Sequence, residues 1–480
     1  MTDHDELGSL PSRWYACLND ALPPDVARLS AAGRLADARR LIEGYLAAGA
    51  PARLEARLRV ELDRLDRVSA AFPFTRERAI ECVRREWPGF SEVDLDRLID
   101  ARRIDWRYVD GEQMIIEDFL DSLRMYPDDV PGLAPKPSED LSARDAMLDE
   151  MRERGFAERR ITLRARLSVT DERLAADLPD RRVRAWLPLP RPCTDHGRRQ
   201  QYDIEVLDAT PGMQVAPELA HQRTAYWEAT GTGDFTVTYA YTQRATWHDM
   251  DGLQHQEDAS LGWDEPASEP PASMARYLGE RQPHIAFTPL VRELARDVWE
   301  GAGRPRGYVA RARAVYDWVT GNVDYRFQPP YALLDCIPQQ TVTLRRADCG
   351  VFALTFITLC RLLCVPARWQ SGLYVRPGEA GSHDWAQFWV PDAGWLWADC
   401  SFGSAGRRTG DARKRAHYFG NLDCWRMVAN DEVFAPLTPP FDGMRDDPFD
   451  NQRGEMSIDG VGVRSAFLAR PVEVLEMAAL

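Results

Sequence analysis

Residues 349–364 read Cys-Gly-Val-Phe-Ala-Leu-Thr-Phe-Ile-Thr-Leu-Cys-Arg-Leu-Leu-Cys, and residues 383–399 read His-Asp-Trp-Ala-Gln-Phe-Trp-Val-Pro-Asp-Ala-Gly-Trp-Leu-Trp-Ala-Asp. The apolar run from 351 to 364 lacks Gly and Pro, is too long for an ordinary strand and is followed by Pro366. This pattern predicts a buried helix. Cys349 then lies at the N-terminus of that helix.

A helix N-terminus suits a nucleophilic cysteine. Its unpaired N–H groups and positive dipole end favour a thiolate, and the same N–H groups can hold a developing oxyanion. The alternative is that Cys349 is a small buried hydrophobic residue, as most free cysteines are. The residues that follow favour the catalytic interpretation.

The second stretch predicts a β-hairpin. Two aromatic-rich segments flank Pro391-Asp392-Ala393-Gly394, which is typical turn composition. If the loop has an odd number of residues, Trp389 faces Trp395 and His383 lies diagonal to Asp399 on the same face. In that register Asp399 orients His383, and His383 takes the proton of Cys349 and later returns it to a leaving group.

These spaced positions resemble the transglutaminase-like cysteine enzymes. The matching residues are Cys349, Arg361, Pro366, Arg368, Gly372, His383, Trp385, Gly394, Trp395 and Asp399. Gln387 stands where a Glu is common in the family. Downstream, residues 418–421 with Arg426 and Asn430, and residues 451–455, are similar to the C-terminal extension of a bacterial subgroup.

The resemblance implies a catalytic triad of Cys349, His383 and Asp399 in a papain/transglutaminase-like core, a helix plus an antiparallel sheet. Tyr325, Gln340 and Trp385 are candidates for the substrate or oxyanion site, beside the Cys349 backbone N–H. The tryptophans of the hairpin either line an acyl pocket or belong to the core. Because some family members have lost the thiol, a binding or scaffolding role stays an alternative.

Composition limits the partners. The chain has 480 residues, 44% of them hydrophobic, and a net charge of −15. Such a charge disfavours nucleic acid and anionic membranes, so we expect a peptide or small-molecule acyl substrate, with or without an amine acceptor. The sequence does not determine the oligomeric state.

The N-terminal residues lack an apolar signal segment, and no run of eighteen apolar residues occurs, so we expect a cytoplasmic protein. Nine cysteines without paired short spacings agree with a reducing compartment. The sequence contains no Cys-x-x-Cys motif, which would indicate a structural zinc site. The expected chemistry requires no metal or organic cofactor.

The periodicity divides the chain into an α+β multidomain protein. We expect a helical region over 1–130, a linker and helix over 131–158 and a β-sandwich-like domain over 159–250. A linker over 251–283, the catalytic domain over 284–430 and a C-terminal extension over 431–480 complete this division. Residues 74–126 also resemble a winged helix-turn-helix, but without a concentrated basic face.

The expected reaction is thiol-dependent acyl transfer through a thioester. Hydrolysis by water is preferred because it needs no second binding site. Amide formation, by a transglutaminase-type reaction or in natural-product assembly, and a non-catalytic peptide-binding module are the alternatives.

Overall fold

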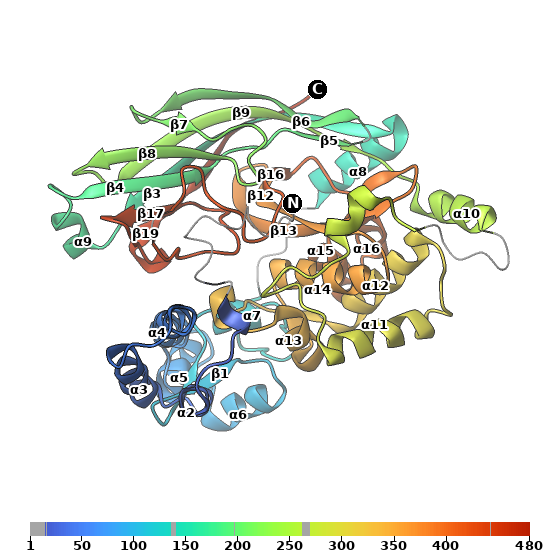
Figure 1. Cartoon of the computed structure of the whole chain (residues 1–480). Helices are drawn as coiled ribbons and strands as arrows, with labels where there is room; N and C mark the ends of the chain where they lie inside the picture. The colour runs from blue at the N-terminus through green and yellow to red at the C-terminus, as the bar shows by residue number, and fades with distance from the viewer. Residues whose placement is uncertain (1–14, 16, 136–140, 196, 262–268, 442) are drawn as a thin grey trace. The chain divides into compact units, whose positions relative to one another are not determined.

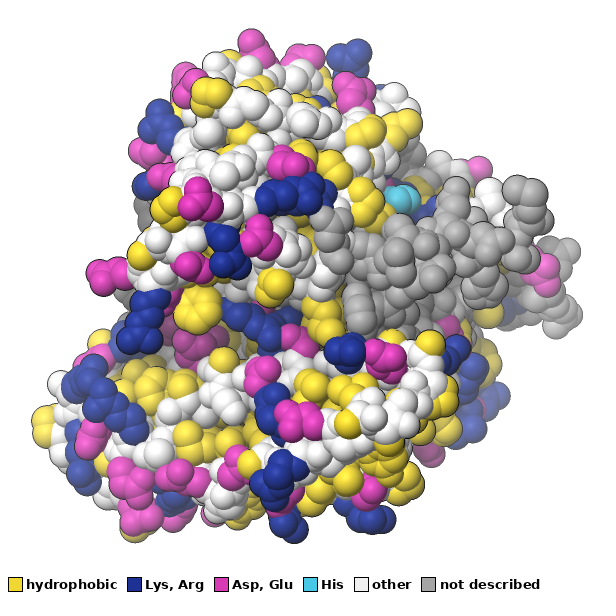
Figure 2. All heavy atoms as spheres, turned by 60° about the vertical axis from the view of Figure 1, so that its left-hand side comes forward, with side chains coloured by type: hydrophobic (Ala, Val, Ile, Leu, Met, Phe, Trp, Pro, Cys, Tyr) yellow, Lys and Arg dark blue, Asp and Glu magenta, His cyan; other side chains and the backbone are white. Residues whose placement is uncertain are grey.

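The computed structural model describes residues 15, 17–135, 141–195, 197–261, 269–441 and 443–480. The chain forms two compact units (Figure 1). Unit 1 contains residues 141–324 and 336–480, and unit 2 contains residues 14–140 and 325–335. Basic and acidic side chains are interspersed over the face drawn in Figure 2, as expected for a chain with 60 of the former and 75 of the latter.

Unit 2 is built mainly of helices. Its helices and strands are α2 (Pro24–Ala31), α3 (Leu35–Ala47), α4 (Ala52–Ala71), α5 (Arg76–Arg84), α6 (Glu92–Asp100), β1 (Trp106–Val109), β2 (Glu112–Ile115) and α7 (Phe119–Leu123). Ser91 caps α6 in a capping box with Asp94, as the sequence predicts. The amphipathic helices bury one common apolar core.

Unit 2 also holds a segment from much later in the chain. Leu333 lies in the unit 2 core, and the Arg64 guanidinium donates to its carbonyl at 3.0 Å and to Asp335 at 2.6 Å. Residues 325–335, which we expected inside the catalytic domain, therefore pack with the N-terminal helices. Helical periodicity could not reveal this, because the contact joins residues more than 250 positions apart.

The first sheet of unit 1 is antiparallel and has the order β15-β14-β13-β12-β16. Its strands are β12 (Ala367–Arg376), β13 (Glu379–Val390), β14 (Gly394–Ala398), β15 (Phe419–Gly420) and β16 (Arg426–Asn430). The buried helix α14 (Cys349–Leu362) packs against β13 and β12.

Further helices surround α14. They are α11 (Pro289–Gly301), α12 (Tyr308–Asn322), α13 (Ile337–Leu344), α15 (Cys400–Thr409) and α16 (Ala412–His417). All of these except α16 contact α14 directly. Helix α14 is therefore the centre of this part of unit 1, which explains why its sequence is apolar on every side.

Two more antiparallel sheets complete unit 1, in the orders β18-β17-β4-β8-β7 and β19-β3-β9-β6-β5, with β20 also on β3. The strands are β3 (Phe156–Val169), β4 (Arg182–Pro188), β5 (Cys193–Asp195), β6 (Arg198–Ala209), β7 (Gln214–Val215), β8 (Thr224–Thr230), β9 (Asp234–Thr246), β17 (Glu455–Ile458), β18 (Val461–Gly462), β19 (Leu468–Ala469) and β20 (Val472–Ala479). Their alternating apolar residues meet in one core, to which β12 and β16 also contribute.

The observed divisions differ from the predicted ones at two places besides residues 325–335. The segment expected to be a C-terminal extension supplies β17 to β20, which pair with β4 and β3. The expected linker over 251–283 contains most of α10 (Met250–Ser260) and a 3-10 turn at Ala272–Tyr277, and its residues 262–268 lie outside the described part. Strand pairing between distant segments leaves no local trace in a sequence.

Two further helices, α8 (Ser142–Arg154) and α9 (Glu172–Ala176), contact β3. In the described part of the chain, no helix has both the length and the apolar composition needed to cross a membrane.

Candidate active site

Helix α14 presents Cys349 at its first turn. Asp348 caps this helix, its carboxylate accepting a hydrogen bond from the Val351 N–H at 3.0 Å. The helix is buried from Gly350 to Arg361, whereas Cys349 itself is partly exposed. The thiol therefore lies at the predicted place, where the core of unit 1 meets solvent.

The hairpin has the register expected for a loop with an odd number of residues. Trp389 pairs with Trp395 and Val390 with Gly394, so that residues 391–393 form the loop. Asp399 follows β14 directly and caps α15, since its Oδ1 accepts from the Phe402 N–H at 2.9 Å. This second role fixes the carboxylate beside the strand that carries His383.

His383 and Asp399 form a buried pair. The His383 Nε2 lies 2.7 Å from the Asp399 Oδ2, and the Arg426 Nη2 donates to the same oxygen at 2.9 Å. Burial by itself raises the pKa of Asp399, but His383 and Arg426 outweigh it and hold that pKa well below its usual value. Asp399 is therefore ionised at neutral pH.

An ionised carboxylate can only accept hydrogen bonds, so Nε2 of His383 carries the hydrogen and Nδ1 is the basic nitrogen. Nδ1 makes no hydrogen bond to any described residue. The Trp385 ring stacks on the imidazole, with ring centroids 6.0 Å apart. The imidazole is thus oriented with one free basic nitrogen.

Two buried carboxylates form ion pairs with the Arg426 guanidinium. It is fully buried and pairs with Asp423 at 3.2 Å as well as with Asp399. Burial opposes its charge, but Asp423 and Asp399 raise the pKa of the guanidinium above its usual value. The sequence contained Arg426 within a motif of the resemblance, but offered no reason to assign it to the Asp399 carboxylate.

The thiol has a partner that the sequence analysis did not consider. The Cys349 Sγ donates to the Asp384 Oδ2 at 3.2 Å, and within the described residues it has no hydrogen bond to His383. Burial, followed by the charges of Asp384 and Asp348, raises the pKa of Cys349 well above its usual value. Burial and the nearby carboxylates thus oppose the stabilisation of a thiolate that the helix N-terminus provides.

The three remaining candidates lie in different surroundings. Trp385 is completely buried, and its Nε1 donates to Gln370 at 2.9 Å, so it is a core residue that supports the imidazole. Gln340 lies on α13, partly exposed, and its side chain has no hydrogen bond to the described residues. Tyr325 belongs to unit 2, where its carbonyl accepts from the Tyr126 hydroxyl.

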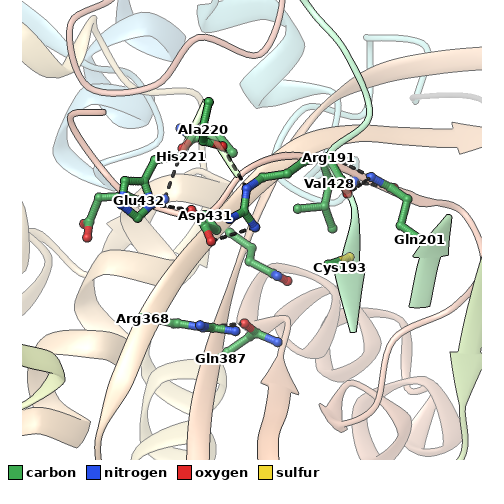
Figure 3. A network of polar contacts seen from close by, with 12 residues as sticks. Arg191, Cys193, Gln201, Ala220, His221, Arg368, Gln387, Val428, Asp431 and Glu432 are labelled. Carbon is green, nitrogen blue, oxygen red and sulfur yellow. Dashed lines mark hydrogen bonds and ion pairs between the residues drawn. The ribbon is translucent and has the colours of Figure 1, made fainter. Parts of the chain in front are cut away.

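A polar network ties the sheet to its surroundings (Figure 3). Asp431, after the end of β16, binds Arg191 and His221, each at 2.7 Å. On the neighbouring strands β12 and β13, Arg368 donates to Gln387 at 2.7 Å. A Gln in place of the Glu that is common in the family thus still accepts a hydrogen bond from the Arg of the motif.

No group of three or more His, Cys, Asp or Glu side chains is arranged to hold a metal ion among the residues that the structure describes. All nine cysteines are free thiols. The groups that can perform chemistry here are a thiol, an oriented imidazole and carboxyl groups.

The thiol lies at a helix N-terminus, the imidazole on β13 and the carboxylate directly after β14. Residues 292–400 match the model of the transglutaminase-like superfamily, which confirms the resemblance of the catalytic motifs. The chain therefore carries a transglutaminase-like domain, and this domain contains Cys349, His383 and Asp399.

One solved structure similar to the chain is a candidate cysteine protease from Cytophaga hutchinsonii, with a sequence identity of 14% and a TM-score of 0.36. The match covers 68% of this chain and 90% of that chain. The periplasmic domain of TgpA from Pseudomonas aeruginosa is also 14% identical, covering 52% and 97% with a TM-score of 0.27. No curated protein matches the chain. At these scores the assignment rests on the family match.

Proposed function

We propose that the protein is an enzyme that transfers acyl groups through a thioester on Cys349. His383 accepts the thiol proton at Nδ1 and later gives it to the leaving group, while Asp399 orients the imidazole. The observation that carries this proposal is the buried His383–Asp399–Arg426 group, which leaves one basic nitrogen free on the imidazole.

The imidazole suits both proton transfers. Asp399, kept ionised by Arg426, stabilises the imidazolium that forms when His383 accepts a proton. The backbone N–H groups at the start of α14 are the oxyanion donors of the proposal, because they lie beside Cys349.

Hydrolysis of an amide or related acyl compound is the preferred outcome, because the reaction with water needs no site for a second substrate. Amide formation with an amine acceptor is the enzymatic alternative. We retain a peptide or small molecule as the substrate class and the cytoplasm as the location, the latter in agreement with nine free thiols.

Intact-mass analysis tests the chemistry. The wild-type protein is incubated with acyl amides, peptides and acyl thioesters, with and without an added amine. We expect a covalent adduct that is absent from Cys349→Ala and forms at least about 100-fold more slowly in His383→Ala. Cys360→Ala, on the same helix, is the matched control and should retain the adduct.

The fate of the adduct separates the outcomes. Discharge by water alone supports the hydrolase, and discharge that requires the amine supports the transferase. An adduct that survives in Cys349→Ala would contradict the role of Cys349. No adduct with any donor, together with an unreactive Cys349, would favour a peptide-binding or scaffolding module.

A further inference from the structure

A buried pair of carboxyl groups touches the nucleophile. Asp384 and Asp450 are 3% and 5% exposed, and the Cys349 Sγ lies 3.2 Å from the Asp384 Oδ2. Asp384 follows His383 on β13, and successive side chains of a strand point to opposite faces. The Asp384 side chain therefore leaves β13 on the opposite face from the His383 imidazole.

The C-terminal segment 445–455 brings Asp450 to this place. A buried two-pronged contact between Arg445 and Glu455, at 3.0 and 2.6 Å, holds the two ends of the segment together. Within the segment, the Gly454 N–H donates to Asn451 at 2.7 Å, and Gln222 donates to the Asn451 carbonyl at 2.5 Å. The segment includes the sequence motif at 451–455, to which the triad gave no role.

The two carboxyl groups share a proton. Burial raises the pKa of both carboxyl groups, and the charge of Asp450 raises that of Asp384 further. Two adjacent buried carboxyl groups do not both ionise near neutral pH. Gln452 donates to the other oxygen of Asp384, and the Ser371 hydroxyl donates to Asp450 at 2.6 Å. The pair is thus fixed from two strands and one loop and carries one negative charge in total.

We propose that Asp384 is a further catalytic residue, which holds the proton of Cys349 on the sulfur in the resting enzyme, and that Asp450 is the positioning residue that shares its charge. The nucleophile then rests as a neutral thiol rather than as a thiolate. This inference rests on the proposed function for its catalytic meaning.

During acylation of Cys349, each bond that breaks is matched by a bond that forms. When an acyl substrate is bound, the S–H bond breaks and an N–H bond forms at Nδ1 of His383. The sulfur electron pair forms the S–C bond, and the carbonyl π electrons move to the oxygen. The carboxyl pair keeps its shared proton and its single charge throughout.

The charges around the sulfur favour the neutral thiol. Asp348 faces it from the cap of α14, and Asp384 from β13, where His383 is the neighbouring residue. Asp447, Glu455 and the cation Arg445 surround Asp450 from the C-terminal segment. Burial raises the pKa of both Asp384 and Cys349, and the acids around each group raise it further.

A thiol held in this way has two properties that suit an acyl-transfer enzyme. Oxidants attack thiolates in preference to thiols, so the resting nucleophile is protected. Once formed, a thiolate of high basicity is more nucleophilic than one of low basicity.

Alkylation by iodoacetamide as a function of pH, followed at each cysteine by peptide mass analysis, tests the inference without any substrate. In the wild type we expect the midpoint for Cys349 to lie above the value of about 8.5 for an ordinary thiol. Exposed Cys364 serves as the internal reference. Partial burial of Cys349 slows its alkylation at every pH. The comparison therefore uses the pH at the midpoint of the alkylation curve, and not the rate alone.

Variants separate charge from structure. Asp384→Asn should lower the midpoint, and Asp384→Asn combined with Asp450→Asn should lower it further, raising the Cys349 rate at pH 7 about tenfold for each pKa unit. Asp450→Asn alone should not lower it, because Asp384 then carries the full charge. Glu379→Gln removes an exposed charge from the same strand and should change nothing.

A wild-type midpoint at or below that of Cys364, or slower alkylation in Asp384→Asn than in wild type at every pH, would overturn the inference. If the Asp384 variants do not fold, the wild-type midpoint decides. Shifted midpoints without an acyl adduct would leave this inference standing and remove the proposed function. An acyl adduct without shifted midpoints would do the reverse.

Discussion

The two carboxylate oxygens of Asp399 make hydrogen bonds with three groups. One oxygen caps α15, and the other binds both His383 and Arg426. Since all of these groups are buried, each loss would leave a polar atom without a partner in a low-dielectric environment. The orientation of the imidazole therefore depends on a guanidinium that contacts no reacting atom.

Arg426→Gln tests this dependence. The change leaves Asp399 and Asp423 buried without their cation, so we expect a loss of about 3–5 kcal/mol in the free energy of unfolding. Urea denaturation measures it. Arg407→Gln, which breaks the exposed pair with Asp324 at 3.1 Å, is the control and should cost no more than about 1 kcal/mol. Equal effects of the two changes would contradict the assigned role of Arg426.

At the scale of elements, the strands β12 and β16 approach each other closely beside His383. Gly372 pairs with His383 on one side and with Val428 on the other. A Cβ atom at Gly372 would lie 1.9 Å from the Met427 carbonyl oxygen, which is backbone and cannot move aside cheaply. The Gly of the family motif is thus explained by packing between strands.

Gly372→Ala should therefore push β16 and Arg426 away from β12. We expect a destabilisation of about 3 kcal/mol or more, measured by thermal and urea unfolding, together with slower acylation of Cys349. Gly381→Ala, on the paired strand β13, meets no atom within 4 Å and is the matched control. A Gly372→Ala protein as stable as Gly381→Ala would show that the strands can separate without cost.

Elements that depend on local pattern were predicted correctly. The apolar run of α14, its start at Cys349 and the register of the hairpin all follow from periodicity and turn composition. The contact between Cys349 and Asp384 could not be predicted in this way, although an acid within an otherwise aromatic strand was a signal. Whether such a side chain faces a thiol depends on how the helix packs on the strand.

At the scale of the whole molecule, the end of the chain completes sheets that begin near residue 156. Strand β20 pairs with β3 along most of its length, and β17 pairs with β4. Between these strands and the transglutaminase-like core lies the segment that supplies Asp450. The C-terminal region thus serves both the structure of unit 1 and the carboxyl pair.

Shortening the chain tests this role. A protein ending at residue 443 loses β17 to β20 and Asp450, exposing apolar residues of the shared core. We expect it to lose cooperative unfolding and soluble yield, measured by circular dichroism and expression. A protein ending at residue 470 loses only β20, and we expect a smaller loss of cooperative unfolding and of soluble yield. A stable, folded protein ending at residue 443 would show that the C-terminal strands are dispensable.

The sequence by itself determined the position of Cys349 on its helix, the hairpin that carries His383 and leads to Asp399, and the resemblance that the family match confirms. These features depend on residues close together in the chain, where periodicity, turns and caps act directly. Only the tertiary structure decided the contact between Cys349 and Asp384, the support of Asp399 by Arg426 and the place of Asp450. Each of these depends on burial and on charges from segments far apart in the chain, which no local pattern records.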